Sequence, residues 1–223
     1  MRVVAVNGSP RKGWNTAKIL ESALDSAQEQ GAEAELVHLY DLRYTGCRSC
    51  FACKRVHAKA ARCALQDDLA PVLSRLLTAD VILMGTPIYF GDISAQLRAV
   101  LERLWFPSLN YDKERTINYP RNVVCGLVFT MNVDKPSLYD GLYQQLTSNM
   151  ERLVGPTKVL TVGDTLQFGD YGKYISTMFD AEHKKQQHEQ QFPEDCQRAK
   201  VWMQELLAQA AQLKGGAVHE DAR

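Results

Sequence analysis

The stretch RVVAVNGSPRKGWNT, residues 2–16, decides the fold of this chain. It opens with an apolar run at residues 2–6 that is typical of a buried strand. A loop of Gly, Ser, Pro and Asn follows, and it leads to a helix expected over residues 15–30. A buried strand, a polar loop and a helix form the first half of a βα unit, so this stretch predicts an α/β protein.

The same unit recurs along the chain. Apolar runs predict further strands at residues 35–39, 80–85, 123–129 and 159–162. Strands that alternate with helices favour a doubly wound parallel sheet with helices on both faces, because parallel neighbours need a crossover. We expect one domain over residues 1–213 and a disordered tail over residues 214–223, which are small and polar. Further helices are expected from Asp67 and Asp68, from near Ser94, over residues 137–153, and over residues 194–213 after a break at Phe192 and Pro193.

The overall charge argues against nucleic-acid and membrane partners. The 26 Lys and Arg residues balance 26 Asp and Glu residues, so no net basic field attracts a polyanion. No apolar run approaches the roughly 18 residues that suggest a membrane span. The six cysteines are more typical of a reducing compartment than of a disulfide framework. We therefore expect a cytoplasmic protein.

The loop after the first strand carries polar groups that suit a phosphate. Ligands of open α/β sheets bind outside the carboxyl ends of the strands, where the strand order reverses. The loop lacks both the G-x-G-x-x-G pattern and the G-K-S/T ending of a P-loop. It offers instead the hydroxyls of Ser9 and Thr16, the amide of Asn15, the cation of Arg11 and the N–H groups of a helix start. The alternative is a plain polar turn.

The loop after the third predicted strand offers a flat apolar surface. It reads TPIYFGDISAQL over residues 86–97, and Tyr89 and Phe90 lie where the interior pattern does not require aromatic residues. This composition favours a planar heteroaromatic ligand. The alternative is that Ile88 and Phe90 only seal the edge of the sheet.

With these motifs the sequence resembles the flavodoxin-like NAD(P)H-dependent FMN reductases, in the branch that includes the iron-sulfur flavoproteins. The residues that carry the resemblance are NGSPR at 7–11, Asn15 and Thr16, GTPIYFG at 85–91, SAQL at 94–97 and QFGDYGKY at 167–174. The resemblance implies a five-stranded sheet of order 2-1-3-4-5 that binds FMN. For the FMN phosphate it implies Ser9, Arg11, Asn15 and Thr16. For the isoalloxazine ring it implies Pro87, Ile88, Tyr89, Phe90 and Gly91. On the other side of the ring it implies Thr130, Met131 and Asn132.

The resemblance also implies an enzyme, an FMN-dependent NAD(P)H oxidoreductase of the flavin or quinone reductase type. Because flavin performs the hydride chemistry itself, no catalytic side chain is expected. Gln167, Tyr171 and Tyr174 are candidates for a slot that takes nicotinamide or a quinone, or are half-buried amphipathic side chains. Such reductases pair as homodimers or homotetramers, and residues 105–121 are predicted to be a lid, a subunit contact or an ordinary surface excursion.

A cysteine cluster supports an alternative function. Cys47, Cys50, Cys53 and Cys63 provide the number of thiolates that a [4Fe-4S] cluster or an all-cysteine zinc site requires. The iron-sulfur flavoproteins carry a similar motif in this region, although the gap before Cys63 is longer here. The alternative function is thus an iron-sulfur flavoprotein or a flavodoxin-like carrier that passes electrons to a protein partner. Free or redox-sensitive thiols remain the third reading.

Overall fold

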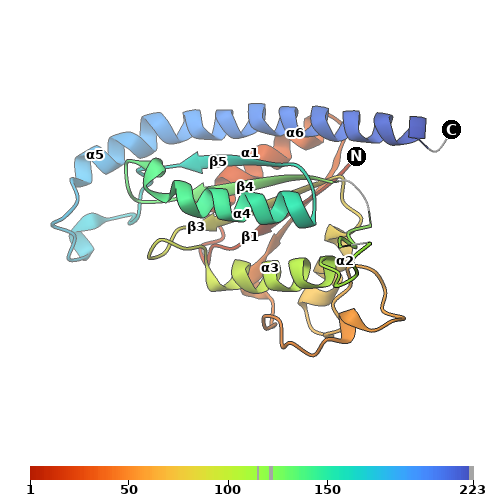
Figure 1. Ribbon diagram of the computed structural model, residues 1–223. Helices are drawn as coiled ribbons and strands as arrows, with labels where there is room; N and C mark the ends of the chain where they lie inside the picture. The colour runs from red at the N-terminus through yellow and green to blue at the C-terminus, as the bar shows by residue number, and fades with distance from the viewer. Residues whose placement is uncertain (115, 121–122, 221–223) are drawn as a thin grey trace.

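The fold is built on one parallel sheet (Figure 1). The computed structural model describes residues 1–114, 116–120 and 123–220, the last five of these by backbone alone. The five strands stand in the order β2-β1-β3-β4-β5, and each pairs in parallel with its neighbours. The predicted flavodoxin-like topology is therefore confirmed. The strands are β1 (Arg2–Asn7), β2 (Glu33–His38), β3 (Val81–Pro87), β4 (Val124–Thr130) and β5 (Thr157–Val162).

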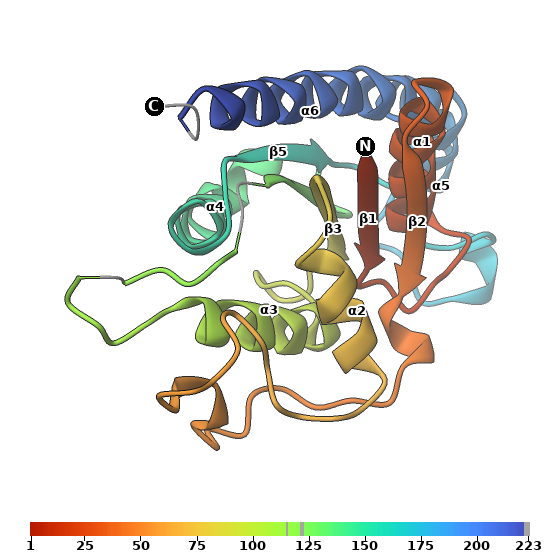
Figure 2. The same ribbon diagram turned by 90° about the vertical axis from the view of Figure 1, so that its right-hand side faces the viewer.

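Helices cover both faces of the sheet, because successive side chains of a strand point to opposite faces. Val3 and Ala5 of β1 pack in the core beneath α1 (Asn15–Glu29) and α6 (Phe192–Glu220). Val4 and Val6 pack in the second core, beneath the helices of the other face (Figure 2). Those helices are α2 (Leu69–Leu76), α3 (Ala95–Ser108) and α4 (Asp140–Leu153).

Two predicted helix starts are confirmed at the level of single hydrogen bonds. The Ser94 hydroxyl caps α3 by accepting from the Leu97 N–H at 3.3 Å. The Asp67 carboxylate accepts from the Leu69 N–H at 3.2 Å at the start of α2. Both side chains satisfy N–H groups that the first turn of a helix leaves without a partner.

The predicted break at Phe192 and Pro193 is wrong. A short helix, α5 (Ala181–Gln186), is followed by a π-helical turn (Gln187–Gln191) that leads directly into α6. Proline disturbs an α-helix by clashing with the carbonyl four residues earlier, and the wider π turn relaxes that clash. The helix also continues beyond Leu213 to Glu220, while residues 221–223 lie outside the described residues. The division between a domain at 1–213 and a tail at 214–223 stays a prediction.

The excursion predicted for residues 105–121 begins later than expected, because α3 includes Trp105 and ends at Ser108. Leu109 then bridges Ile117, and the Tyr119 hydroxyl donates to the Leu76 carbonyl at 2.9 Å. A helix of this length spans about 20 Å, so the excursion lies at the far end of α3 from Ser94. Residues 115 and 121 lie outside the described residues, and the role of subunit contact stays a prediction.

Within the described part of the chain, no helix combines the length and apolar character needed to cross a membrane.

Candidate functional site

Three loops meet at the carboxyl ends of β1, β3 and β4, where the strand order reverses, and they line a cavity of about 150 Å³. This is the position at which open α/β sheets bind ligands. Ten of the predicted cofactor residues line this cavity: Ser9, Arg11, Asn15, Thr16, Pro87, Ile88, Tyr89, Thr130, Met131 and Asn132. The structure thus gathers three sequence motifs that are far apart along the chain around one space.

The start of α1 offers N–H groups to this cavity. The residue that precedes the helix is Trp14, and its side chain makes no capping hydrogen bond. The first N–H groups of a helix have no partner within the helix, and together with the helix dipole they attract an anion. The loop is held in place because the Ser9 N–H donates to Asn7 Oδ1 at 2.9 Å and the Arg11 N–H to Ser9 Oγ at 3.2 Å. This geometry fits a phosphate group.

The loop after β3 makes a tight turn that projects an aromatic ring into solvent. Tyr89 and Asp92 exchange backbone hydrogen bonds of 2.8 and 3.0 Å across the turn. Phe90 and Gly91 both have positive φ, 50° and 81°, as a type I′ turn requires. The Phe90 side chain is fully exposed and does not line the cavity, and neither does Gly91. Tyr89 does line it, and burial raises the pKa of its phenol against the opposing effect of Arg11.

The loop after β4 is anchored from behind by a buried lysine. Lys184 of α5 donates from Nζ to the Asn132 carbonyl at 2.7 Å and to the carboxylate of Asp164, whose other oxygen lies 2.7 Å from His183 Nε2. Burial opposes the ionisation of Asp164, but these two partners outweigh it and lower the pKa of the carboxyl. Asn132 lines the cavity, and its buried side-chain Oδ1 accepts no hydrogen bond from the described residues. The anchor therefore holds an acceptor at the site.

The loop after β5 closes one side of the cavity, and the sequence analysis named only Gln167 among its lining residues. Its Leu166 carbonyl accepts from Trp14 Nε1 at 3.1 Å and from Asn15 Nδ2 at 2.8 Å, and its Gln167 carbonyl accepts from Arg11 Nη1 at 2.5 Å. The one signal in the sequence for this contact was Trp14, a tryptophan inside the polar loop after β1. The lining residues that the sequence analysis did not name are Trp14, Thr165 and Leu166.

The candidate slot residues separate into different roles. Gln167 lines the cavity, whereas the Tyr171 hydroxyl accepts from the Gln167 N–H at 3.1 Å. Tyr174 stacks on Phe168, with ring centroids 4.2 Å apart, outside the cavity. The structure therefore places Tyr171 behind the loop and Tyr174 beside the site.

The four clustered cysteines line a second, small space against α3. Cys47, Cys50, Cys53 and Cys63 surround a cavity of about 10 Å³, which is room for about one water. Within the described residues, no group of three or more Cys, His, Asp or Glu side chains is arranged to hold a metal ion. As placed, the thiols do not fit a cubane, because the space between them holds about one water. The segment that carries the cysteines would have to open to admit a cluster.

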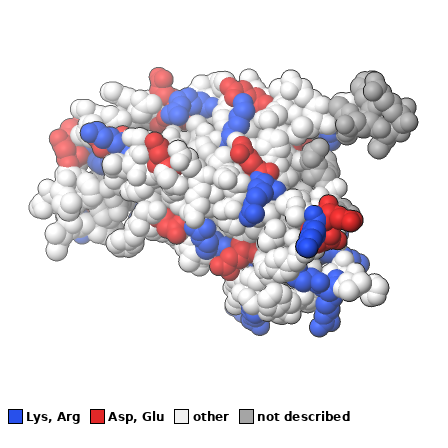
Figure 3. Space-filling model, viewed as in Figure 1, with Lys and Arg blue, Asp and Glu red and all other residues white. Residues whose placement is uncertain are grey.

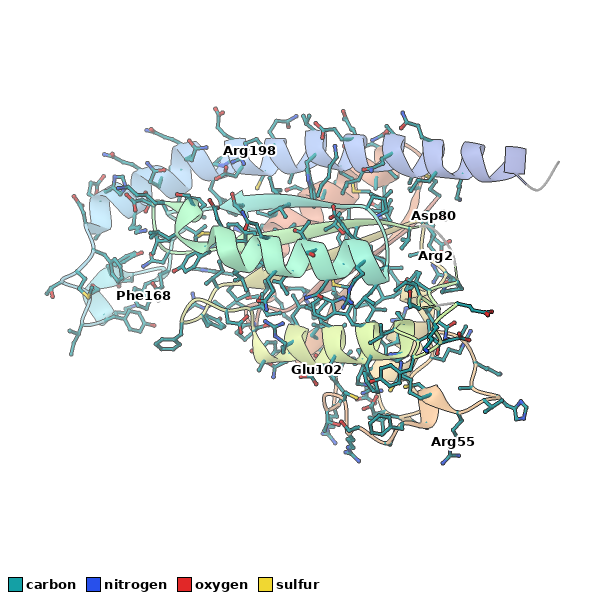
Figure 4. The ribbon with its side chains drawn as sticks, in the orientation of Figure 1. Arg2, Arg55, Asp80, Glu102, Phe168 and Arg198 are labelled. Atoms are coloured by element: carbon teal, nitrogen blue, oxygen red, sulfur yellow. The ribbon has the colours of Figure 1, made fainter. Side chains whose placement is uncertain are left out.

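A buried arginine clamps both ends of the cysteine segment. Arg103 of α3 is almost fully buried, and its guanidinium donates to the Thr45 carbonyl at 3.1 Å, the Leu65 carbonyl at 3.2 Å and the Asp67 carboxylate at 2.6 Å. Burial opposes the charge on Asp67, but the hydrogen bond and charge of Arg103 together with backbone hydrogen bonds outweigh it and lower the pKa of that carboxyl. Figure 4 shows the cysteine segment, near the labelled Arg55, beside α3, which carries the labelled Glu102. Glu102 accepts from the Cys47 N–H at 3.0 Å.

Comparisons with known proteins match the fold and the part of the chain that carries the first two cavity loops. An iron-sulfur flavoprotein of Methanocaldococcus jannaschii is 36% identical over 103 residues, which are 46% of this chain and 51% of that protein. An iron-sulfur flavoprotein of Archaeoglobus fulgidus is 25% identical over 169 residues, 76% of this chain and 69% of that protein. The chain spans about half the length of the first curated relatives it matches.

A solved structure supports the fold. The NAD(P)H:quinone oxidoreductase of Methanothermobacter marburgensis superposes with a TM-score of 0.66 at 17% identity, over 91% of this chain and 97% of that one. The family described as NADPH-dependent FMN reductase matches residues 1–123, more than half of the sequence and all of the first two cavity loops. The chain therefore belongs to the NADPH-dependent FMN reductase family.

Proposed function

We propose that this protein is an FMN-dependent NAD(P)H oxidoreductase that takes hydride from a reduced nicotinamide and passes the electrons to a quinone or a similar small acceptor. The observation that carries the proposal is the cavity itself, in which a phosphate-type helix start, a cation and a loop of apolar and aromatic residues converge. Six free cysteines further support a cytoplasmic location, because a reducing compartment maintains free thiols.

The residues present fit FMN. The start of α1 and Arg11 supply N–H groups and a positive charge for the phosphate, and Asn132 Oδ1 is a buried acceptor that needs a donor. The cavity of about 150 Å³ is smaller than common cofactor sites, which are about 300–1,000 Å³. Part of the cofactor would therefore remain accessible to a second reactant.

The chain's own residues bind and orient rather than react. Bound FMN would supply the hydride chemistry. Thr16 and Thr130 share a hydrogen bond of 2.7 Å across the cavity floor, which ties the first loop to the third. Lys184 fixes the Asn132 backbone, and the turn at Phe90 fixes the approach of the second loop. Preorganised dipoles of this kind cost no reorganisation when charge develops on a ligand.

FMN titration of purified protein, followed by flavin fluorescence, tests the binding step. The variant Arg11→Gln should weaken FMN binding about tenfold to a hundredfold, since a charge-assisted hydrogen bond contributes about 1.5–3 kcal/mol. Lys12→Gln is the matched control, because Lys12 is exposed and paired with Asp41 at 2.5 Å. Equal affinity in both variants would remove Arg11 from the phosphate site.

Steady-state assays with NADH, NADPH and a quinone test the reaction. We expect parallel double-reciprocal lines, because both reactants would use the same open face in turn. Intersecting lines would contradict this mechanism. The absence of turnover with both NADH and NADPH would refute the proposed function.

The second candidate function is an iron-sulfur flavoprotein or an electron carrier that serves a protein partner. It is favoured by the names of the relatives and by the presence of four cysteines in one segment, which would have to open to hold a cluster. Against a docking carrier, positive and negative side chains are interspersed over most of the face in Figure 3, and the whole chain has no net charge. Iron and acid-labile sulfide, assayed on protein purified without oxygen, decide the matter: about four irons per chain would establish a cubane.

We also propose that the protein assembles as a homodimer or homotetramer. Two loops that flank the site expose large apolar side chains: Phe90, Ile175 and Met178 are each at least 90% exposed. These exposed side chains support the proposal because a large apolar surface at the rim of a site suits a contact with another subunit. Light scattering coupled to gel filtration tests this, and a monomer at micromolar concentration would contradict it.

A further inference from the structure

A second cavity lies directly beside the candidate FMN cavity. It has a volume of about 400 Å³ and shares Arg11, Trp14 and Gln167 with the first cavity. Its size falls within the range of small-molecule sites, about 300–1,000 Å³. The three shared residues form the boundary between the two cavities, so an extended ligand that passes over Arg11 would reach both.

The walls of this second cavity are aromatic. Phe168 and Tyr174 lie nearly parallel, with centroids 4.2 Å apart and planes 16° apart, and Tyr171 packs edge-on against Phe168. Trp14 also lines the cavity, and its ring centroid lies 5.3 Å from the Arg11 guanidinium carbon. Figure 4 shows Phe168 in the loop that joins β5 to α5. These aromatic rings and the Arg11 cation form a surface for a planar ring that carries a phosphate.

The cavity is held open by the backbone around it. Trp14 and Arg11 both donate to carbonyls of the loop, and the Tyr171 hydroxyl braces the same loop from behind. Its other lining residues include two glycines: a side chain at Gly13 would meet nothing within 4 Å, and one at Gly169 would meet only Trp14, at 4.0 Å. The two glycines leave the space beside Trp14 free of side chains, which suits a flat ring.

We propose that this aromatic cavity, defined by Trp14, Phe168 and Tyr174, binds the adenosine phosphate half of NAD(P)H. The inference rests on the proposed function, in which the nicotinamide half reacts at the adjoining cavity. Among the reactants of that function, the dinucleotide is the one that carries a second planar ring joined through phosphates to the reacting ring. Stacking of a base on an aromatic side chain contributes about 1–3 kcal/mol, and Arg11 lies at the boundary where the phosphates would pass.

The experiment compares NADPH and NADH with reduced nicotinamide mononucleotide, which lacks the adenosine half. In the FMN-loaded variants Tyr174→Ala and Phe168→Ala, we expect KM for the dinucleotides to rise about 5- to 150-fold. KM for the mononucleotide, kcat and FMN affinity should stay as in the wild type. Tyr111→Ala is the control, because Tyr111 is an exposed aromatic residue on the excursion at the far end of α3. An equal rise for dinucleotides and mononucleotide, or no rise at all, would overturn the proposal.

A binding measurement separates this inference from the proposed function. Calorimetric titration of the FMN-loaded protein with 5′-AMP and 2′,5′-ADP should show binding to the wild type and to Tyr111→Ala, and its loss in Tyr174→Ala. Binding of these nucleotides without any turnover of NAD(P)H would sustain the cavity and refute the oxidoreductase. Turnover of NAD(P)H without binding of these nucleotides would sustain the oxidoreductase and refute the adenosine site in this cavity.

Discussion

Replacing Lys184 by methionine tests the anchor behind the candidate site. The change removes the donor to the Asn132 carbonyl and the main partner of the Asp164 carboxylate, in a side chain that is only 6% exposed. Loss of one partner of a buried ion pair costs about 3–5 kcal/mol. Asp164 keeps His183 and is 17% exposed, so we expect the lower end, about 3 kcal/mol of unfolding free energy.

Urea unfolding of the variant, read beside Lys185→Met, measures this loss. Lys185 is the exposed neighbour on the same helix and should change the unfolding free energy by less than about 0.5 kcal/mol. Because Asn132 lines the cavity, FMN affinity should also fall in Lys184→Met and not in the control. Equal stability and equal FMN affinity in the two variants would refute the anchor.

The same variant carries a pH signature. The pKa of Asp164 is lowered from its ordinary value of 3.8, so the pair stabilises the folded chain above that pH and loses its contribution as pH falls through the lowered pKa. Without Lys184, burial is opposed by His183 alone and the pKa of Asp164 rises. The stability difference between wild type and variant should therefore shrink as pH falls below about 4. A difference that stays constant between pH 7 and pH 3 would contradict this account.

Three further substitutions probe the loops and the clamp. Phe90→Asn should stabilise the protein by about 1 kcal/mol in thermal unfolding, because asparagine tolerates positive φ better, and should weaken dimerisation if the exposed ring is a contact. Arg103→Met should lower the free energy of chemical unfolding by about 3–5 kcal/mol, since it leaves the Asp67 carboxylate and two carbonyls without their donor. Arg98→Met removes only a surface ion pair and should lower it by less than about 1 kcal/mol. Gly85→Ala should lower the free energy of unfolding by about 1–3 kcal/mol and reduce FMN affinity, because its Cβ would lie 2.6 Å from a leucine and 2.9 Å from a threonine of α1. Gly141→Ala is the control: its Cβ meets open space, so the change should be neutral or stabilising by up to about 1 kcal/mol.

The sheet could be predicted from the sequence because its strands are short apolar runs separated by polar loops. Residues 80–85 contain an unbroken apolar run, and β3 is buried along almost its full length. The loops could be predicted for a related reason: residues 7–16 and 86–92 carry Gly, Pro, Asn and Ser next to aromatic or charged side chains, and each follows a strand directly. Their convergence follows from the parallel topology alone.

The anchor could not be predicted in the same way. Lys184 lies 52 residues after Asn132, in a stretch rich in Lys, Gln and His that reads as a solvated surface. Its burial depends on how α5 docks after the loop from β5, which is a property of tertiary packing and leaves no periodic signal. The π-helical turn that admits Pro193 is hidden for the same reason: local rules for proline predict a break, and the wider turn that avoids it depends on neighbouring contacts.

Three features of the site lower the stability of the chain, and a bound ligand would compensate the first two. The N–H groups at the start of α1 lack a capping side chain, Asn132 Oδ1 is buried without a donor, and Phe90 holds a positive φ that costs about 1–2 kcal/mol for a residue other than glycine. Each feature lowers the stability of the chain on its own, and the first two are compensated when an anion and a hydrogen-bond donor bind. Binding to the folded state alone adds RT ln(1 + [L]/Kd), about 2.7 kcal/mol at a hundredfold excess over Kd. The site is therefore expected to couple stability to cofactor, so that FMN raises the melting temperature of the wild type more than that of Arg11→Gln at the same concentration.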